Sequence, residues 1–179
     1  AKADQGDASL VRLPEAEGRA RALWLAPAGA VPDQPTLDLN LWQWLEVRSG
    51  VATVSAPVVE AFVPQMLNYE SVDGVNFKKG CYPGQEVVAR SQFRGTLKRR
   101  AYLAHSKEPM AVGDPVFHDS DSEQPTGTVV AVAAHPETGF DAIVSIQTSS
   151  ATSGVLTVGA AGGAALQLLA LPYPLRDDI

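Results

Sequence analysis

The run GTVVAVAAHPETGFDAIVSI, residues 127–146, decides the fold of the second half of the chain. Its two apolar runs flank a short segment with proline and glycine, as expected for two strands joined by a turn. Further short apolar runs lie at residues 101–104, 115–117, 155–158 and 164–171. Turns rich in Gly, Pro, Asp and Ser separate these runs, so residues 96–179 are predicted to form a small antiparallel β-barrel or sandwich.

The region before the barrel has a mixed pattern. Residues 9–14 and 19–27 alternate well enough to predict two strands, and 38–49 have helical spacing with Asp38 at the first turn and Gly50 just past the end. Residues 51–77 look irregular apart from a helical turn near Pro57, and a second helix is expected from about Gln85. The sequence thus predicts an α+β portion over 9–95. The polar residues 1–8 are expected to be disordered or an artificial terminal edge.

Composition excludes several classes of protein. The chain has 179 residues and is long enough to bury a core without a metal or a disulfide. No apolar run reaches the length of a membrane span, and a cytoplasmic protein is expected. The single cysteine, Cys81, excludes an intramolecular disulfide and is far short of a zinc or iron–sulfur ligand set, so no stable metal site is expected.

The net charge of −6 conceals a basic segment. Half of the 14 Lys and Arg residues lie within residues 78–100, where Glu86 is the sole acidic residue: Lys78, Lys79, Arg90, Arg94, Lys98, Arg99 and Arg100. This segment either offsets acidic neighbours within the fold or forms an anion-binding surface. The isoelectric point near 5.0 argues against a nonspecific nucleic-acid binder.

The basic segment opens with the glycine-rich run KKGCYPGQEVVAR, residues 78–90. Gly80 and Gly84 permit close approach of a ligand, and the loop amides ahead of a helix start could form an anion site. Cations around Cys81 would make its thiol reactive, although an isolated cysteine is more often a small buried hydrophobe. The run is neither a Walker A motif nor a dinucleotide fingerprint.

The same run carries a specific resemblance. Phe77 to Glu86 (FKKGCYPGQE), continuing VVAR and then FRG at 93–95, resembles the signature of the YgfZ family, folate-binding proteins related to the glycine-cleavage T-protein (aminomethyltransferase). The segment FVPQ at 62–65 followed by Asn68, and the ending LPYPL at 171–175, also resemble that family. The resemblance covers about residues 37–175.

The resemblance implies a fold and a role. It implies part of a T-protein-like α+β domain followed by a β-barrel, with folate held near the centre of the protein. Members support iron–sulfur enzymes and, through them, tRNA modification. Because family chains are nearly twice as long, this chain resembles a C-terminal half, with an N-terminal portion of the same protein as its partner.

The resemblance also assigns site residues. Cys81 becomes the candidate catalytic thiol, acting as a nucleophile or a transient cluster ligand. Folate contacts fall on Trp42, Lys78, Lys79, Gly80, Tyr82, Gly84, Gln85, Glu86, Arg90 and Arg94. Trp24 and Trp44 are expected in the core. Glu86 could equally pair with a cation, and Tyr82 could pack beneath the loop. Arg48 departs from the T-protein pattern, which has an acidic residue there.

Three functions remain open at this point. The first is a folate-binding accessory protein for iron–sulfur cluster assembly or repair, which would meet iron–sulfur proteins or assembly factors. The second is a folate-dependent aminomethyl- or methyltransferase, which needs a base that the sequence does not place beside Cys81. The third is a module that binds tRNA directly through residues 78–100, for which affinity would fall steeply with salt.

Overall fold

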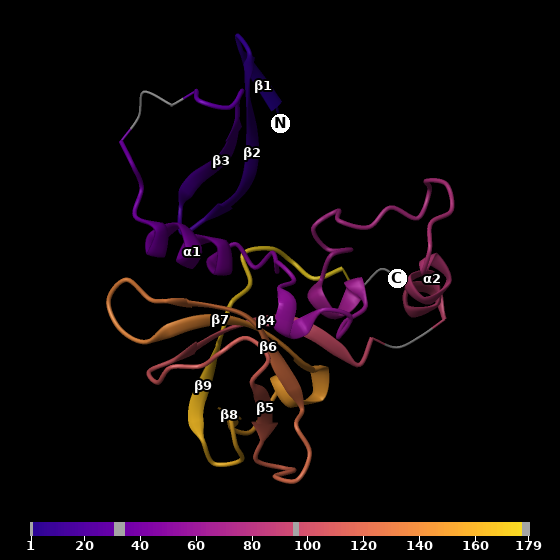
Figure 1. Cartoon of the computed structure of the whole chain (residues 1–179). Helices are drawn as coiled ribbons and strands as arrows, with labels where there is room; N and C mark the ends of the chain where they lie inside the picture. Colours follow the sequence, from indigo (N-terminus) through magenta and orange to yellow (C-terminus); the bar gives the residue numbers. More distant parts are fainter. Residues whose placement is uncertain (1, 31–34, 95–96, 177–179) are drawn as a thin grey trace.

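The computed structural model describes residues 2–30, 35–94 and 97–176, and combines a small open sheet, two helices and a barrel (Figure 1). The strands are β1 (Lys2–Gln5), β2 (Ala8–Ala16), β3 (Arg19–Leu25), β4 (Arg99–Ser106), β5 (Pro115–His118), β6 (Gly127–Ala134), β7 (Phe140–Gln147), β8 (Leu156–Val158) and β9 (Ala164–Leu169). The helices are α1 (Leu39–Arg48) and α2 (Gln85–Phe93), with short 3-10 turns at Ala56–Val58, Pro64–Leu67 and Thr148–Ala151. In the described ranges, no helix is long and apolar enough to cross a membrane.

The first three strands form an antiparallel sheet in the order β1-β2-β3. The two strands predicted from alternation are confirmed as β2 and β3, and their register shifts between Leu13 and Ala16. The expectation that residues 1–8 are disordered is wrong for the described part, because Lys2–Gln5 pairs with β2 from Lys2↔Val11 to Gln5↔Ala8. A polar strand can form there because it lies at the edge of the sheet and needs no buried face.

Helix α1 begins and ends as its sequence predicts. The side chain of Asp38 accepts the backbone N–H of Asn40 at 2.7 Å, which satisfies one of the free donors of the first turn. Gly50 adopts φ 68°, the left-handed conformation that ends many helices. Leu45 and Val47 are buried, and Val47 packs with residues of β4, β6 and β7, which holds this helix against the barrel.

The second half closes into a six-stranded antiparallel barrel, in the order β4-β7-β6-β5-β8-β9 with β9 returning to β4. The predicted antiparallel barrel is therefore confirmed. Strand β7 is covered on both faces, since Val144 and Ile146 fill the barrel while Ile143 packs outward against α1 and the turn at Pro64–Leu67. The polar residues of its outward face, Asp141 and Ser145, are therefore buried as well.

The irregular segment between α1 and α2 is fastened by buried polar side chains. Asn68, at φ 60°, donates to the carbonyl of Ala101 at 2.8 Å and accepts the N–H of the same residue at 3.2 Å. Gln65 donates to the carbonyl of Val88 at 2.7 Å, which ties helix α2 to the turn at Pro64–Leu67. These bonds position the glycine-rich loop and α2 beside the barrel.

Candidate functional site

The glycine-rich loop is held at both ends by local contacts. At its start, the backbone N–H of Lys78 donates to the side chain of Asn76 at 2.8 Å. At its end, Gly84 takes φ 83° as the N-cap of α2, and the side chain of Gln85 accepts the N–H of Tyr82 at 3.3 Å. The rings of Phe77 and Phe93 meet edge-to-face at 5.2 Å between centroids, fixing the loop against the far end of α2.

Cys81 is free and exposed on this loop, so its alternative interpretation as a small buried hydrophobe is wrong. The ammonium of Lys79 lies 4.9 Å from the centroid of the Tyr82 ring, one residue past the thiol. Tyr82 is half-buried, whereas Lys78, Lys79 and Gly80 are exposed. The loop therefore presents its thiol to solvent beside two cations.

No described histidine is engaged with this thiol. His105 contacts Asp141, His118 contacts Ser120, and the Nδ1 of His135 accepts the backbone N–H of Glu137 at 3.1 Å. All three lie in the barrel half. Over the described ranges, no group of three or more His, Cys, Asp or Glu side chains could hold a metal ion.

Of the two arginines at helix α2, Arg90 is paired with an acidic side chain and Arg94 is exposed. Arg90 donates to Glu86 at 2.6 Å, so Glu86 takes the structural role that was left open for it. Both side chains are largely exposed, which makes this i,i+4 pair a weak contributor to stability. Arg94 follows α2 as its C-cap and is exposed.

The three tryptophans occupy different environments. Trp42 is half-buried on α1, with the guanidinium carbon of Arg21 5.0 Å from its ring centroid. Arg21 is itself buried, and that burial lowers the pKa of its guanidinium. Trp44 packs at the edge of the core as expected but also donates to Asp141. Trp24, expected in the core, is only half-buried on β3.

The structure does not bring Trp42 and the glycine-rich loop together. Helix α1 lies over one side of the barrel end, and the loop lies on the other side with α2 (Figure 1). Four pockets lie along the barrel and beside α2, and neither Trp42 nor Cys81 is among the described residues that line them. Within this chain, the predicted folate contacts therefore form two separate groups.

A polar cluster that the sequence did not indicate lies where α1 meets the barrel. Asp141 is 1% exposed, and its two oxygens accept from Trp44 Nε1 and contact His105 Nδ1, each at 2.8 Å. Arg48 lies 3.5 Å from the same carboxylate and also pairs with Glu17 at 2.6 Å. Arg48 therefore has two carboxylate partners, which is a structural reason for a cation at this position.

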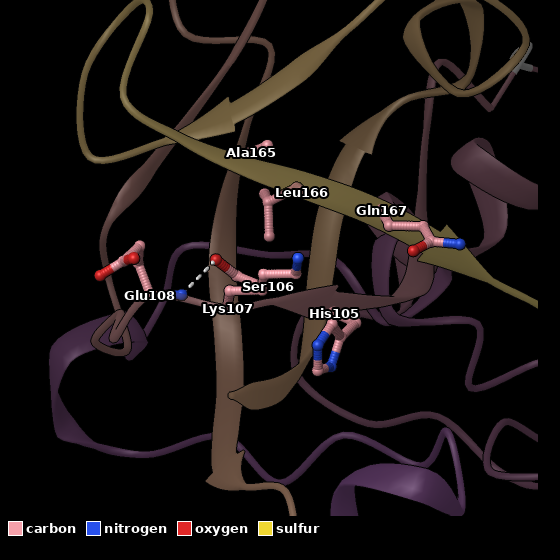
Figure 2. Close-up of a pocket in the computed structure, with 7 residues that line it drawn as sticks. All are labelled: His105, Ser106, Lys107, Glu108, Ala165, Leu166 and Gln167. Carbon is pink, nitrogen blue, oxygen red and sulfur yellow. Dashed lines mark hydrogen bonds between the residues drawn. The ribbon is translucent and has the colours of Figure 1, made fainter. Parts of the chain in front are cut away.

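This cluster lines a pocket of about 450 Å³, whose walls include Glu17, Trp44, His135, Glu137 and Gln167. A neighbouring pocket of about 410 Å³ opens between β4 and β9, as Figure 2 shows. His105 and Gln167 are paired between these strands and both belong to its lining, and Ser106 accepts the backbone N–H of Glu108 at 3.2 Å. A third hollow, of about 440 Å³, lies beside β8 and β9. In the sequence, the signal for the cluster was Asp141, a lone carboxylate within an apolar run.

Comparison with curated proteins finds relatives over most of the chain. The tRNA-modifying protein YgfZ of Sodalis glossinidius (strain morsitans) is 32% identical over 143 residues, which are 78% of this chain and 44% of that protein. The YgfZ of Serratia proteamaculans is 31% identical over 144 residues (79% and 44%), and that of Cronobacter sakazakii is 35% identical over 140 (76% and 43%). The chain is related to the YgfZ family. It spans less than half the length of these YgfZ proteins, and no protein-family model matches it.

Several residues that carry the YgfZ resemblance outside the loop have structural roles. The hydroxyl of Tyr173, in the LPYPL ending, donates to the carbonyl of Gly50 at 2.8 Å and lies 3.4 Å from Asn68 Nδ2. Burial raises the pKa of Tyr173 above the ordinary tyrosine value. Asn68 and Gln65 use their amides on backbone carbonyls, as described above. These residues build the frame of this fold, whereas Cys81 lies exposed on the glycine-rich loop.

Proposed function

We propose that the protein serves tRNA modification as an accessory factor for iron–sulfur cluster assembly or repair, with Cys81 as a transient thiol. The relatives are named tRNA-modifying proteins, and a role for this chain follows by its similarity to them. The observation that carries the proposal is the placement of Cys81, exposed on a loop that is anchored at both ends. A thiol so placed can reach a group held by another protein.

The surroundings of Cys81 favour the role of a transient ligand over that of a nucleophile. A nucleophilic thiol is usually activated by an adjacent base, and the described imidazoles all have other contacts. A thiolate is also a soft ligand suited to iron. With one cysteine in the chain, the remaining ligands of a cluster would come from the partner iron–sulfur protein or assembly factor.

Folate binding is part of the proposal only for the longer protein. The described residues do not by themselves fit a folate, because Arg21 covers one side of Trp42 and the loop residues lie elsewhere. We assign no step to folate in this chain. A folate-dependent transferase is not favoured by any contact described above.

The open sheet supports the idea that more protein covers it. Leu10 is 37% exposed, and Leu23 and Leu25 are 44% and 56% exposed. Leu10 is paired with Trp24 and Val11 with Leu23, so these leucines lie on opposite faces of the sheet. Strands with apolar residues on both faces are typical of sheets covered on both sides. We infer that another portion of the full-length protein supplies this cover and completes the folate site.

The test is replacement of Cys81 in the full-length protein. Cys81→Ser removes the soft ligand while keeping the size of the side chain. In cells that lack the protein, this variant should leave sulfur-modified tRNA nucleosides at the level of the empty vector. Val87→Ser, at another exposed position nearby on α2, is the control and should restore them. Full restoration by Cys81→Ser would show that the thiol role is wrong.

A further inference from the structure

The basic segment is not one surface, because the structure sends its arginines in different directions. Arg99 and Arg100 are neighbours on β4, so their side chains point to opposite faces. Arg100 is 6% exposed and pairs with the buried carboxylate of Glu70. Arg99 faces the other way and donates to the carbonyl of Thr126 at 2.8 Å. Arg100 is therefore a structural cation, while Arg99 remains at the surface.

Four of the remaining cations line one pocket of about 470 Å³ between α2 and the start of β4. The lining consists of Arg90, Arg94, Lys98 and Arg99 together with Ser91 and the apolar side chains Val63, Met66 and Leu97. We call this the α2–β4 basic pocket. Its cations come from two elements that are separate in the fold, so their convergence is a product of the tertiary structure.

Among the described residues that line this pocket there is no carboxylate. Glu86, one turn before Arg90 on α2, is the nearest acid along that helix and pairs with Arg90. Arg94 and Lys98 are exposed and have no side-chain partner within the described ranges. Because the whole chain carries −6, a concentration of cations here would attract an anion selectively to this place.

We propose that the α2–β4 basic pocket binds RNA, with its cations on backbone phosphates and Val63, Met66 and Leu97 against a ribose or base. Arginine forks match phosphate oxygens bidentately, and three of the four cations are arginines. The carboxylates of a polyglutamyl folate tail are a competing anion for these cations, and the experiment below therefore includes that folate as a competitor. This inference goes beyond the proposed function, which needs no contact between this protein and RNA.

The experiment measures binding of the full-length protein to an unmodified tRNA transcript by fluorescence anisotropy, from 50 to 300 mM NaCl. Arg94→Gln with Lys98→Gln should reduce the affinity by roughly 10- to 30-fold at 0.1 M salt. It should also make the slope of log K against log salt shallower by about 1 to 2. Arg12→Gln with Lys107→Gln removes the same charge from exposed positions on other elements and should change neither.

Four results would overturn the inference, and the first three are no tRNA binding at 50 mM salt, an equal loss in both double variants, and displacement of tRNA by equimolar polyglutamyl folate. Displacement by equimolar ATP would likewise assign the pocket to free nucleotides instead of RNA. Cys81→Ser should leave the binding curve unchanged, which separates this test from that of the thiol.

Discussion

Trp44 donates its indole N–H to the carboxylate of Asp141 at 2.8 Å, joining helix α1 to strand β7 across 97 residues of sequence. The other oxygen of this carboxylate contacts His105 on β4, and Arg48 lies 3.5 Å away. Asp141 is thus the electrostatic junction between the helix and the barrel. Its burial means that the charge depends on these partners for its stability.

Replacing Asp141 by alanine should lower the free energy of unfolding by about 3 kcal/mol, because Trp44 and His105 lose their common acceptor. Urea denaturation followed by tryptophan fluorescence measures this. Glu137→Ala, an exposed carboxylate in the same pocket, should change stability by less than about 0.5 kcal/mol. Equal losses in the two variants would contradict a junction at Asp141.

The ion pair of Glu70 with Arg100 predicts a strong non-additive effect. Arg100→Met leaves a carboxylate of 1% exposure unpaired and should cost about 3 to 5 kcal/mol. Combining it with Glu70→Leu should recover most of that loss, because no buried charge remains. Arg99→Met is the matched control and should cost at most about 1 kcal/mol, the net value of its bond to Thr126. Additive losses in the double-mutant cycle would argue against the pairing.

Replacement of two glycines by alanine should have different effects on stability. A Cβ at Gly127 would lie 2.2 Å from the carbonyl oxygen of Ser145, so β6 and β7 would have to separate, at a cost of about 2 kcal/mol or more. A Cβ at Gly80 would meet nothing within 4 Å, and Gly80→Ala should stay within about 0.5 kcal/mol of wild type. Thermal unfolding of both variants decides the matter. A clear loss at Gly80 would mean that the loop is more tightly packed than its geometry indicates.

Tyr173 predicts a dependence of stability on alkaline pH. Burial raises its pKa in the folded state, so the unfolded chain loses the phenol proton first. The stabilising contribution is complete below the ordinary pKa, near 10, and is lost as pH rises through the folded value. Tyr173→Phe should therefore flatten the fall in stability above pH 10. It should also cost about 1 kcal/mol at pH 7 through its lost bond to Gly50.

Tyr102→Phe provides the comparison for Tyr173. Burial also raises the pKa of Tyr102, although the charge of Arg100 opposes the shift. This variant should flatten the alkaline profile without a comparable loss at pH 7, because no hydrogen bond of its hydroxyl is described. Denaturation at several pH values between 8 and 11 measures both effects. Parallel profiles for wild type and both variants would show that neither phenol contributes to alkaline unfolding.

Local pattern was sufficient for most elements of this fold, but not for β1, because its polar residues gave no strand pattern. Strand β6 and the turn after it follow from the apolar run at residues 127–134 and the glycine at 139, and α1 follows from Asp38 and the spacing of its leucines. The pairing of β9 with β4, which closes the barrel, was beyond the sequence. It depends on pairs such as Leu103↔Leu169. The alternation of residues within one strand does not show which distant strand it pairs with.

The same limit applies to the candidate site. The glycine-rich loop could be found because its residues are contiguous in sequence. The cluster around Asp141 could not, since Glu17, Trp44 and His105 are brought to it by the tertiary fold. The basic segment lies between these cases: composition located it, but only the strand geometry of β4 separates Arg100 from the surface cations.

The opposite facing of Arg99 and Arg100 has a consequence for how such sequences diverge. A mutation that neutralises position 100 is removed by selection for folding, whatever the protein does. A mutation at position 99 leaves the folded state nearly unchanged, so only selection for binding can remove it. Natural variation at position 100 would therefore reflect selection for folding. Variation at the adjacent position 99 would reflect selection for ligand binding.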